Sequence, residues 1–261
     1  MKFVCIGTGA MGSAIFKSIC KKYNPDDITV TNKTVKKARL FAEENRCHFC
    51  ESNKDAVVGA DFVFLAVKPQ NLEDVFSEIN ESLTQTQVVV SMAAGVSLEK
   101  LQTFSPKARF VRIMPNVGAQ IGQGMTAFCC ANTISDSEKD LLKDILSSTG
   151  FVEEIPEKLM NCVTAVSGSS PAFVFMFIEA IADAAVRCGM SRTQSYIFAS
   201  QTVKGAASLV LETEKHPAVL KDSVCSPSGT TIEGVAALEA NGFRSAVIDA
   251  ITQAYKKSML L

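Results

Sequence analysis

One stretch, residues 160–190, constrains the fold more than any other part of the chain. From Phe173 onward apolar residues recur at helical spacing, and the opposite side of the same helix is apolar as well. The polar side chains form only a narrow stripe, made by Glu179, Asp183 and Arg187. A helix that is hydrophobic nearly all round must be covered on nearly all sides. We therefore expect it to be the central member of a bundle that includes a second subunit.

The same stretch is not expected to cross a membrane. Asn161, Thr164 and several serines interrupt the uncharged run before Glu179, and the continuous apolar part is too short to span a bilayer. Small residues and a proline at 167–172 predict a kink where another backbone or a ligand can come close.

Composition bounds the partners and the compartment. The 261 residues suffice for one large or two ordinary domains, and a net charge of -1 offers no basic stripe for nucleic acid or anionic membrane. Nine cysteines, an odd number, without a signal peptide at the start, indicate free thiols in a reducing cytosol. We expect a cytoplasmic protein with neither nucleic acid nor membrane as a partner.

The sequence Cys47-His48-Phe49-Cys50 raises a metal or redox hypothesis, because its spacing allows both thiols to face one ion. No second pair at ligand spacing accompanies it, and the chain has only two histidines. We expect these side chains to pack in a short strand at 47–50, and we expect no metal site.

Residues 2–23 predict a strand, a glycine-rich turn and a helix, which is the context of a dinucleotide-binding turn. Gly7 permits the tight turn, Gly9 lets the backbone approach a pyrophosphate, and Gly12 lets the helix pack on the strand. The helix N-terminus then presents unpaired N–H groups to the phosphates. A turn that is merely tight is the alternative.

The end of the second expected strand, 28–32, bears on the choice of nicotinamide cofactor. An acidic residue there would accept hydrogen bonds from the ribose of NAD and repel a 2′-phosphate. The chain instead has Asn32 and Lys33, with Lys36 and Lys37 following. The sequence therefore favours NADPH, with NADH as the less favoured cofactor.

The remaining pattern predicts an α/β fold, with a Rossmann-type, doubly wound, mainly parallel sheet in residues 1–156 and an all-helical dimerisation domain in 157–261. Continuous apolar runs suited to buried parallel strands end in small or polar turns at one sheet edge. The expected strands are 61–67, 88–91, 109–114 and 151–155, and the expected helices include 35–46, 136–148 and 193–213.

The turn cluster at 222–231 opens another expected helix. Ser226, Thr230 and Thr231 can cap that helix, and its free N–H groups form a site for an anion such as a carboxylate. An ordinary capped helix start is the alternative interpretation.

Several motifs together resemble the pyrroline-5-carboxylate reductase family, essentially from end to end. The last two in the chain are the most specific. The motifs are Gly7-Thr-Gly-Ala-Met-Gly12, Val67-Lys68-Pro69, Ala93-Ala94-Gly95, Met114-Pro115-Asn116, Ser167-Gly-Ser-Ser-Pro-Ala172 and Ser226-Pro-Ser-Gly-Thr-Thr231.

The resemblance implies NADPH-dependent hydride transfer to the imine of 1-pyrroline-5-carboxylate, giving L-proline in the final step of proline biosynthesis. It implies a homodimer or a higher homo-oligomer of dimers. It assigns the substrate to Ser169, Ser226, Gly229, Thr230 and Thr231, with the segment from Ser167 to Pro171 lining the pocket and the Thr231 hydroxyl as the catalytic contact to the ring nitrogen. At the helix start, the N–H groups of Gly229, Thr230 and Thr231 are expected to fix the carboxylate. The resemblance assigns the cofactor to Gly7, Thr8, Gly9, Ala10, Met11, Gly12, Asn32, Lys33, Asn53, Ala66, Val67, Lys68, Pro69 and Ala93.

Two positions depart from the family pattern. Ser228 replaces the first glycine of the usual Gly-Gly before the threonines, and Phe173 stands where tyrosine is common. A side chain at position 228 could restrict the loop, and the missing hydroxyl at 173 argues against an essential acid there.

Two rival interpretations share parts of this pattern. A β-hydroxyacid dehydrogenase needs a lysine on its central helix to polarise a carbonyl, and no lysine lies between Lys158 and Lys204. A nucleotide-sensing binding module without chemistry is the second rival.

Overall fold

The computed structural model describes residues 1–260 of the 261. The chain divides into two compact units. The first comprises Met1–Gly168 together with the C-terminal segment that begins at Ala254, and the second comprises Ser169–Gln253. The division at residue 156 that the sequence suggests stays a prediction.

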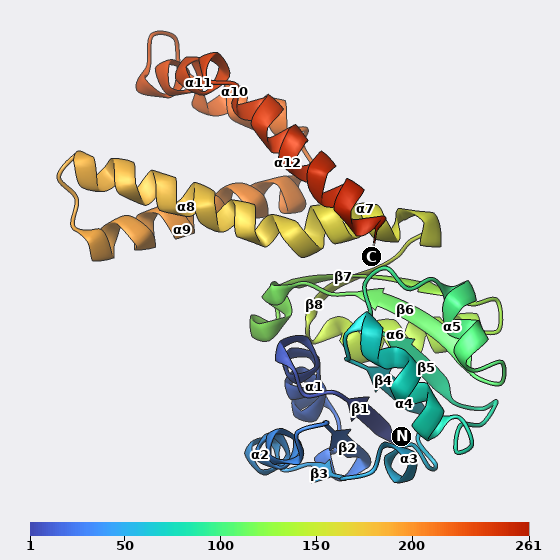
Figure 1. Ribbon diagram of the computed structural model, residues 1–261. Helices are drawn as coiled ribbons and strands as arrows, with labels where there is room; N and C mark the ends of the chain where they lie inside the picture. The colour runs from blue at the N-terminus through green and yellow to red at the C-terminus, as the bar shows by residue number, and fades with distance from the viewer. Residues whose placement is uncertain (261) are drawn as a thin grey trace. The chain divides into compact units, whose positions relative to one another are not determined.

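The first unit is built on a mainly parallel sheet of eight strands (Figure 1). Its spatial order is β3-β2-β1-β4-β5-β6-β7-β8, in which the chain starts in the middle and winds outward to both edges. The strands are β1 (Phe3–Ile6), β2 (Ile28–Thr31), β3 (His48–Phe49), β4 (Phe62–Leu65), β5 (Val88–Ser91), β6 (Arg109–Met114), β7 (Gly124–Cys130) and β8 (Gly150–Glu154).

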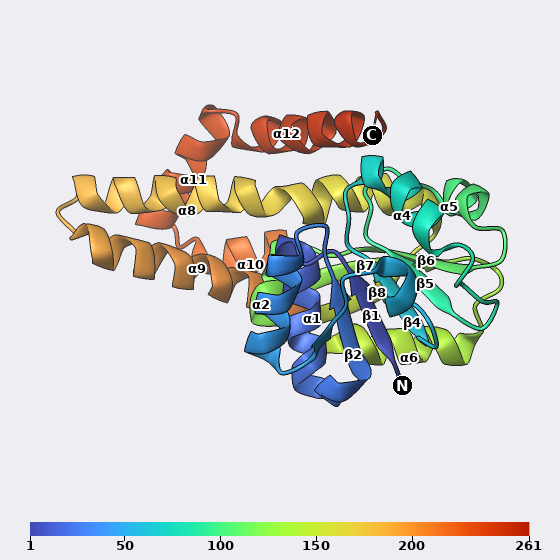
Figure 2. The same cartoon turned by 60° about the horizontal axis from the view of Figure 1, so that its bottom comes forward.

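Helices cover both faces of this sheet because its central strands are apolar on both sides. Alternate residues of β1 show this: Phe3 and Cys5 enter one core, while Val4 and Ile6 enter the other. One face packs against α1 (Ala10–Lys22), α2 (Val35–Asn45) and α6 (Asp136–Ser147); the other packs against α4 (Leu72–Ile79) and α5 (Leu98–Phe104), with α3 (Asn53–Ala56) beside α4 (Figures 1 and 2). The predicted doubly wound fold is confirmed.

One strand was not expected from the sequence. β7 runs antiparallel to β6, and the short 3-10 helix η3 (Val117–Ile121) connects the two strands. β8 then pairs with β7 in parallel. Gly124 and Gly150 lie side by side at the start of β7 and β8, where a Cβ on Gly150 would come 2.1 Å from the Gly124 carbonyl oxygen. These two glycines, which weaken the strand pattern in the sequence, therefore allow the backbones of β7 and β8 to come close together.

A continuous helical run follows the sheet. It comprises η4 (Glu157–Leu159), α7 (Met160–Val163), the π-helical segment η5 (Thr164–Ser169) and α8 (Ser170–Arg187). The kink predicted at 167–172 overlaps the π-helical segment, which also contains the boundary between the two units. By length and composition alone, the run Glu157–Arg187 is apolar enough to cross a membrane, a test that core helices of soluble proteins also pass.

The second unit is helical. α8 and α9 (Arg192–Thr213) pack along each other, followed by α10 (Pro217–Val224), α11 (Thr230–Ala240) and most of α12 (Phe243–Ser258) (Figures 1 and 2). Ala182 is the one residue of α8 that is buried, although the sequence predicts a helix covered on nearly all sides. Large apolar side chains are exposed instead, including Phe175, Met176, Ile197, Phe198, Leu211 and Ile248.

A polar link ties α1 to α6 in the first unit. The Lys22 ammonium lies 2.6 Å from the Asp144 carboxylate, and the Tyr23 hydroxyl donates to that carboxylate at 2.7 Å. Burial and this hydrogen bond raise the pKa of Tyr23 to about 12. The folded state therefore favours the neutral phenol over the phenolate.

This pKa predicts an alkaline loss of stability. Below the unfolded pKa of about 10, Tyr23→Phe should lower the free energy of unfolding by about 1 kcal/mol, because it deletes one hydrogen bond. The difference from the wild type should shrink as pH rises from about 10 to about 12, since the unfolded chain releases the phenol proton first. Urea unfolding across this range measures it, with Tyr255→Phe as the control; a constant difference would contradict the link.

Candidate active site

The glycine-rich turn after β1 is held by close backbone packing. Gly7 has φ +107°, and a Cβ there would lie 2.5 Å from the Ala66 carbonyl oxygen. A Cβ on Gly12 would lie 2.1 Å from the Gly7 carbonyl oxygen. By contrast, a Cβ on Gly9 would meet no atom within 4 Å. Gly7 and Gly12 are thus required by the fold, whereas Gly9 leaves open space beside the turn.

The N-terminus of α1 opens at this turn. Gly9 is the N-cap residue, no side chain caps the helix, and its first turn carries no acidic residue. The first N–H groups and the positive end of the helix dipole are therefore available to an anion. This arrangement fits the pyrophosphate of a dinucleotide.

A groove of about 610 Å³ lies next to the turn and gathers residues from five separate segments. Eight of the residues predicted to bind the cofactor line it: Gly7, Gly9, Asn32, Lys33, Asn53, Ala66, Val67 and Lys68. The carboxyl ends of β1, β2 and β4 place them there, as expected for a ligand site of an open parallel sheet.

The other predicted cofactor residues are arranged around this groove. Thr8 and Ala10 line a second groove of about 420 Å³ beside α1 and α2, and Met11 packs against the core. Pro69 opens the 3-10 helix η2 (Pro69–Asn71). Ala93 is buried, and its N–H donates to the Ser91 hydroxyl at 3.3 Å.

Asn32 links the second strand to the turn. Its side-chain oxygen accepts from the Thr8 N–H at 3.1 Å, and its amide nitrogen donates to the Thr34 carbonyl at 3.2 Å. Lys33 and Lys37 line the cofactor groove with it. This end of the groove therefore combines an uncharged amide with two cations.

The groove also has acidic side chains that were not predicted from the sequence. Glu51, Asp74 and Glu78 line it. Asp74 and Glu78 belong to α4, the helix that follows β4, and helices of such units begin at the carboxyl edge of the sheet. Helical spacing of four residues between them was the available signal.

The loop Ser226–Thr231 in the second unit forms a tight turn before α11. The Gly229 N–H donates to the Ser226 carbonyl at 3.1 Å, with Pro227 and Ser228 between them. Ser228 has φ +56°, which matches the third position of a type II turn, where glycine is preferred. A Cβ on Gly229 would lie 2.3 Å from the Ser226 hydroxyl oxygen, so a side chain there would force this hydroxyl to move.

The expected side-chain caps of this helix are wrong. Gly229 is the N-cap residue and no side chain caps α11, because the helix begins at Thr230 itself. The first N–H groups of α11 therefore have no side-chain partner, although Glu233 lies in the same first turn. Ser169, the remaining predicted substrate residue, ends the π-helical segment and belongs to the same unit as the loop.

Comparison with known proteins identifies the family. Residues 157–261 match the model of pyrroline-5-carboxylate reductase dimerisation, and residues 2–95 match that of NADP oxidoreductase coenzyme F420-dependent. The chain is 43% identical to pyrroline-5-carboxylate reductase of Escherichia coli strain K12, over 97% of this chain and 95% of that protein. The chain belongs to the pyrroline-5-carboxylate reductase family.

Solved structures agree with this assignment. The pyrroline carboxylate reductase of Plasmodium falciparum with NADP bound superimposes with a TM-score of 0.90 at 30% identity, covering 100% of this chain and 97% of that one. The enzyme of Streptococcus pyogenes gives a TM-score of 0.90 at 35% identity, covering 100% and 99%. The predicted resemblance, oxidoreductase class, activity and NADPH cofactor are thereby confirmed for the family to which the chain belongs.

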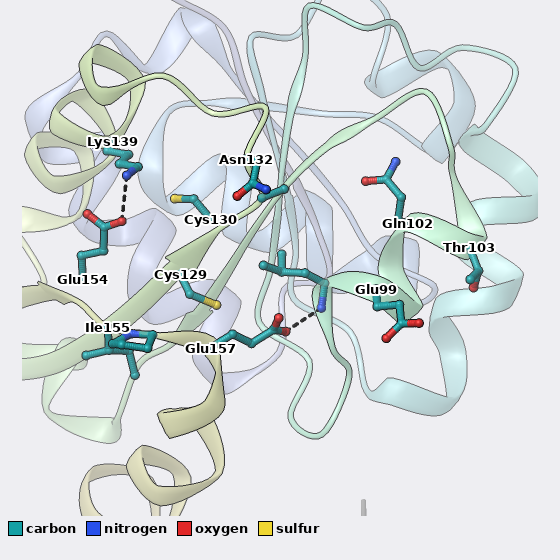
Figure 3. Close-up of a pocket in the computed structure, with 13 residues that line it drawn as sticks. Glu99, Gln102, Thr103, Cys129, Cys130, Asn132, Lys139, Glu154, Ile155 and Glu157 are labelled. Atoms are coloured by element: carbon teal, nitrogen blue, oxygen red, sulfur yellow. Dashed lines mark hydrogen bonds and ion pairs between the residues drawn. The ribbon is translucent and has the colours of Figure 1, made fainter.

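Another groove, of about 1030 Å³, is lined by residues between Leu98 and Glu157 and by none of the glycine-rich turn (Figure 3). Three of the charged side chains that line it have partners: Lys139 pairs with Glu154 at 2.9 Å, and Glu157 accepts from the Leu98 N–H at 2.7 Å. Glu157 also pairs with Arg112 at 2.6 Å. Burial raises the pKa of the Cys129 and Cys130 thiols, to about 11 and about 12, so both are neutral near pH 7. Lys139, Glu154 and Glu157 therefore act as structural links in this groove.

The Cys47–Cys50 segment of the reductase packs as expected. Cys47 contacts the core, and the Cys50 thiol donates to the Ser52 carbonyl at 3.2 Å. His48 is exposed, 3.8 Å from Asp26. Within residues 1–260, no group of three or more His, Cys, Asp or Glu side chains is placed to hold a metal ion.

The two glycines of the turn make a matched test of this geometry. Gly9→Ala should change the free energy of unfolding by no more than about 0.5 kcal/mol from the wild-type value. It should nevertheless raise KM for NADPH about tenfold or more, because the added methyl group enters groove space that the cofactor would occupy. Gly12→Ala should instead cost about 1–3 kcal/mol of stability through overpacking. Thermal unfolding and initial rates measure both, and equal loss of stability in the two variants would contradict the distinction.

Proposed function

We propose that this chain reduces 1-pyrroline-5-carboxylate to L-proline with NADPH, the final step of proline biosynthesis, using the residues that line the two sites above. The observation that carries the proposal is the uncapped N-terminus of α1, which opens onto a groove lined by Asn32 and Lys33 in a chain similar to these reductases from end to end. Absorbance at the reduced-nicotinamide band, with protein, NADPH and the cyclic imine mixed, tests it.

The cofactor role belongs to the first unit. When bound, NADPH supplies the hydride. The turn at Gly7–Gly12 would hold its pyrophosphate through helix N–H groups, and Lys33 would meet the 2′-phosphate as a cation. Val67 and Lys68 would line the path along the carboxyl end of β4.

The substrate role belongs to the loop Ser226–Thr231. The Gly229 N–H is already held by the Ser226 carbonyl, so the carboxylate would be bound by the N–H groups of Thr230 and Thr231. Gly229 contributes space, because any side chain there would meet the Ser226 hydroxyl. Ser169 and Ser226 add hydroxyl groups from the same unit.

The residues of the loop suit an imine better than a carbonyl. Residues 226–231 contain no His, Lys, Asp or Glu to protonate a developing alkoxide. An imine can arrive already protonated and become an amine without a strong acid on the enzyme. The main task of the protein is then orientation, and the Thr231 hydroxyl would hydrogen-bond the ring nitrogen.

The chain forms a homo-oligomer through its helical dimerisation segment, residues 157–261. We assign the cofactor to residues 1–156 and dimerisation to the rest, with a homodimer, or a larger assembly of dimers, as the working form. The protein acts in the cytoplasm on a small molecule, without a membrane or nucleic acid as partner. Its charge of -1 and nine free cysteines support this placement.

The exposed apolar helices predict the oligomeric state. Side chains such as Met176, Ile197 and Phe198, each more than 60% exposed, would be covered by a second copy. Light scattering at micromolar concentration should give a mass of at least twice 28.0 kDa. A single-chain mass across that range would contradict the proposal.

Cofactor choice should depend on the charge at position 32. Asn32→Asp keeps an acceptor for the Thr8 N–H but places a carboxylate beside the 2′-phosphate. We expect the preference of kcat/KM for NADPH over NADH to fall by about 1–3 kcal/mol. Asn24→Asp, which adds the same charge beside a 3-10 helix outside the groove, is the control. An unchanged ratio would place discrimination elsewhere.

The Thr231 hydroxyl should matter for turnover with the imine. Thr231→Ala and Thr231→Val should both lower kcat by about one to two orders of magnitude, because each deletes a positioning contact and the second keeps the shape. Thr252→Val, which removes a hydroxyl bonded to the Ile248 carbonyl on α12, should have no such effect. Steady-state rates decide this, and wild-type kcat and KM in both variants would leave orientation to the backbone alone.

A further inference from the structure

The side chain of Asn53 is held by two partners from different elements. Its oxygen accepts from the Thr31 hydroxyl at 2.5 Å, and its amide nitrogen donates to the Glu78 carboxylate at 2.6 Å. Thr31 ends β2 and is 1% exposed, whereas Glu78 is an exposed residue of α4. Asn53 itself is the first residue of α3 and lines the cofactor groove together with Glu78.

The chemistry of these partners fixes which way the amide points. An ionised carboxylate only accepts hydrogen bonds, so the NH2 group of Asn53 must face Glu78. The amide oxygen must then face Thr31, whose hydroxyl can donate to it. The amide nitrogen has a second N–H, and within residues 1–260 the hydrogen bonds of Asn53 side-chain atoms are these two.

We propose that Thr31 and Glu78 are positioning residues that fix the Asn53 amide so that its second N–H donates to an acceptor atom in the adenosine part of NADPH. The inference rests on the proposed cofactor role of the groove. The adenosine side follows from topology: the glycine-rich turn would hold the pyrophosphate, and Asn53 bonds to the end of β2, where Asn32 and Lys33 would meet the 2′-phosphate.

The sign of the effect separates positioning from plain charge. Glu78 adds negative charge beside an anionic cofactor, so if charge alone mattered, Glu78→Gln would tighten binding. If Glu78 fixes the amide, Glu78→Gln removes the acceptor-only partner and lets the amide turn over. We then expect KM for NADPH and Kd for NADP to rise about three- to tenfold, with kcat and KM for the imine unchanged. Thr31→Val, which deletes the donor within a similar shape, should do the same.

Glu81→Gln is the matched control. Glu81 pairs with Lys54 at 2.9 Å, so it links α3 to the turn that follows α4, and it lies outside the lining of the groove. If these contacts only tether the two helices, Glu78→Gln and Glu81→Gln should have equal effects on thermal unfolding and on cofactor affinity. Positioning predicts that only Glu78→Gln changes the affinity.

A double variant gives a readout that a structural tether would not. Asn53→Asp with Glu78→Gln restores a hydrogen bond between positions 53 and 78 but reverses it, so position 53 can only accept. Thermal unfolding should return toward the wild-type value, while Kd for NADP stays raised. Recovery of both together would overturn the proposal.

Asn53→Ala distinguishes failure of this inference from failure of the cofactor assignment. If Asn53→Ala leaves Kd for NADP unchanged, Asn53 is not a cofactor residue and the assignment fails. If Asn53→Ala weakens binding but Glu78→Gln and Thr31→Val do not, only the positioning role fails. The proposal is supported if Glu78→Gln as a single variant weakens NADP binding and causes no further loss of affinity when it is combined with Asn53→Ala.

Discussion

The first unit depends on how closely the backbone of α1 approaches the turn after β1. Gly12 packs against the Gly7 carbonyl with no room for a Cβ, and Gly7 packs in the same way against Ala66 at the end of β4. These contacts fix the helix N-terminus over the carboxyl edge of the two central strands. The same constraint that packs the helix therefore aims its unpaired N–H groups at the groove. Fold and cofactor site share one cause.

The sequence was sufficient to predict an element wherever the pattern that identifies it lies within one segment of the chain. The strand, turn and helix at the N-terminus were predictable because Gly7, Gly9 and Gly12 stand at fixed spacing after an apolar run. β7 was not predictable in this way, because the structural reason for its glycine and small residues appears only when β7 pairs with the next strand at Gly150. The acidic residues of the groove were not predictable for a similar reason: Glu78 looks like an ordinary helix-surface residue until α4 is placed beside Asn53.

The helical unit illustrates a different limit of sequence patterns. The apolar circumference of α8 shows that other elements must cover this helix, but it does not show which elements these are. In a single chain α9 packs along α8, and Ala182 is the one residue of α8 that is buried. Large apolar side chains of α8 therefore stay exposed to water. Exposed surface of that extent on a helical segment matching a dimerisation family is best explained by association of copies.

The two residues before the threonines of the substrate loop, Ser228 and Gly229, are constrained by different contacts. Position 228 adopts the left-handed conformation that a type II turn demands, and a serine there costs about 1 kcal/mol relative to glycine. Position 229 has ordinary φ, yet a side chain there would have to displace the Ser226 hydroxyl. The two positions of the family's Gly-Gly pair are therefore constrained differently. A chain can lose the first glycine at a modest conformational cost, whereas a substitution of the second would move the hydroxyl of a proposed substrate residue.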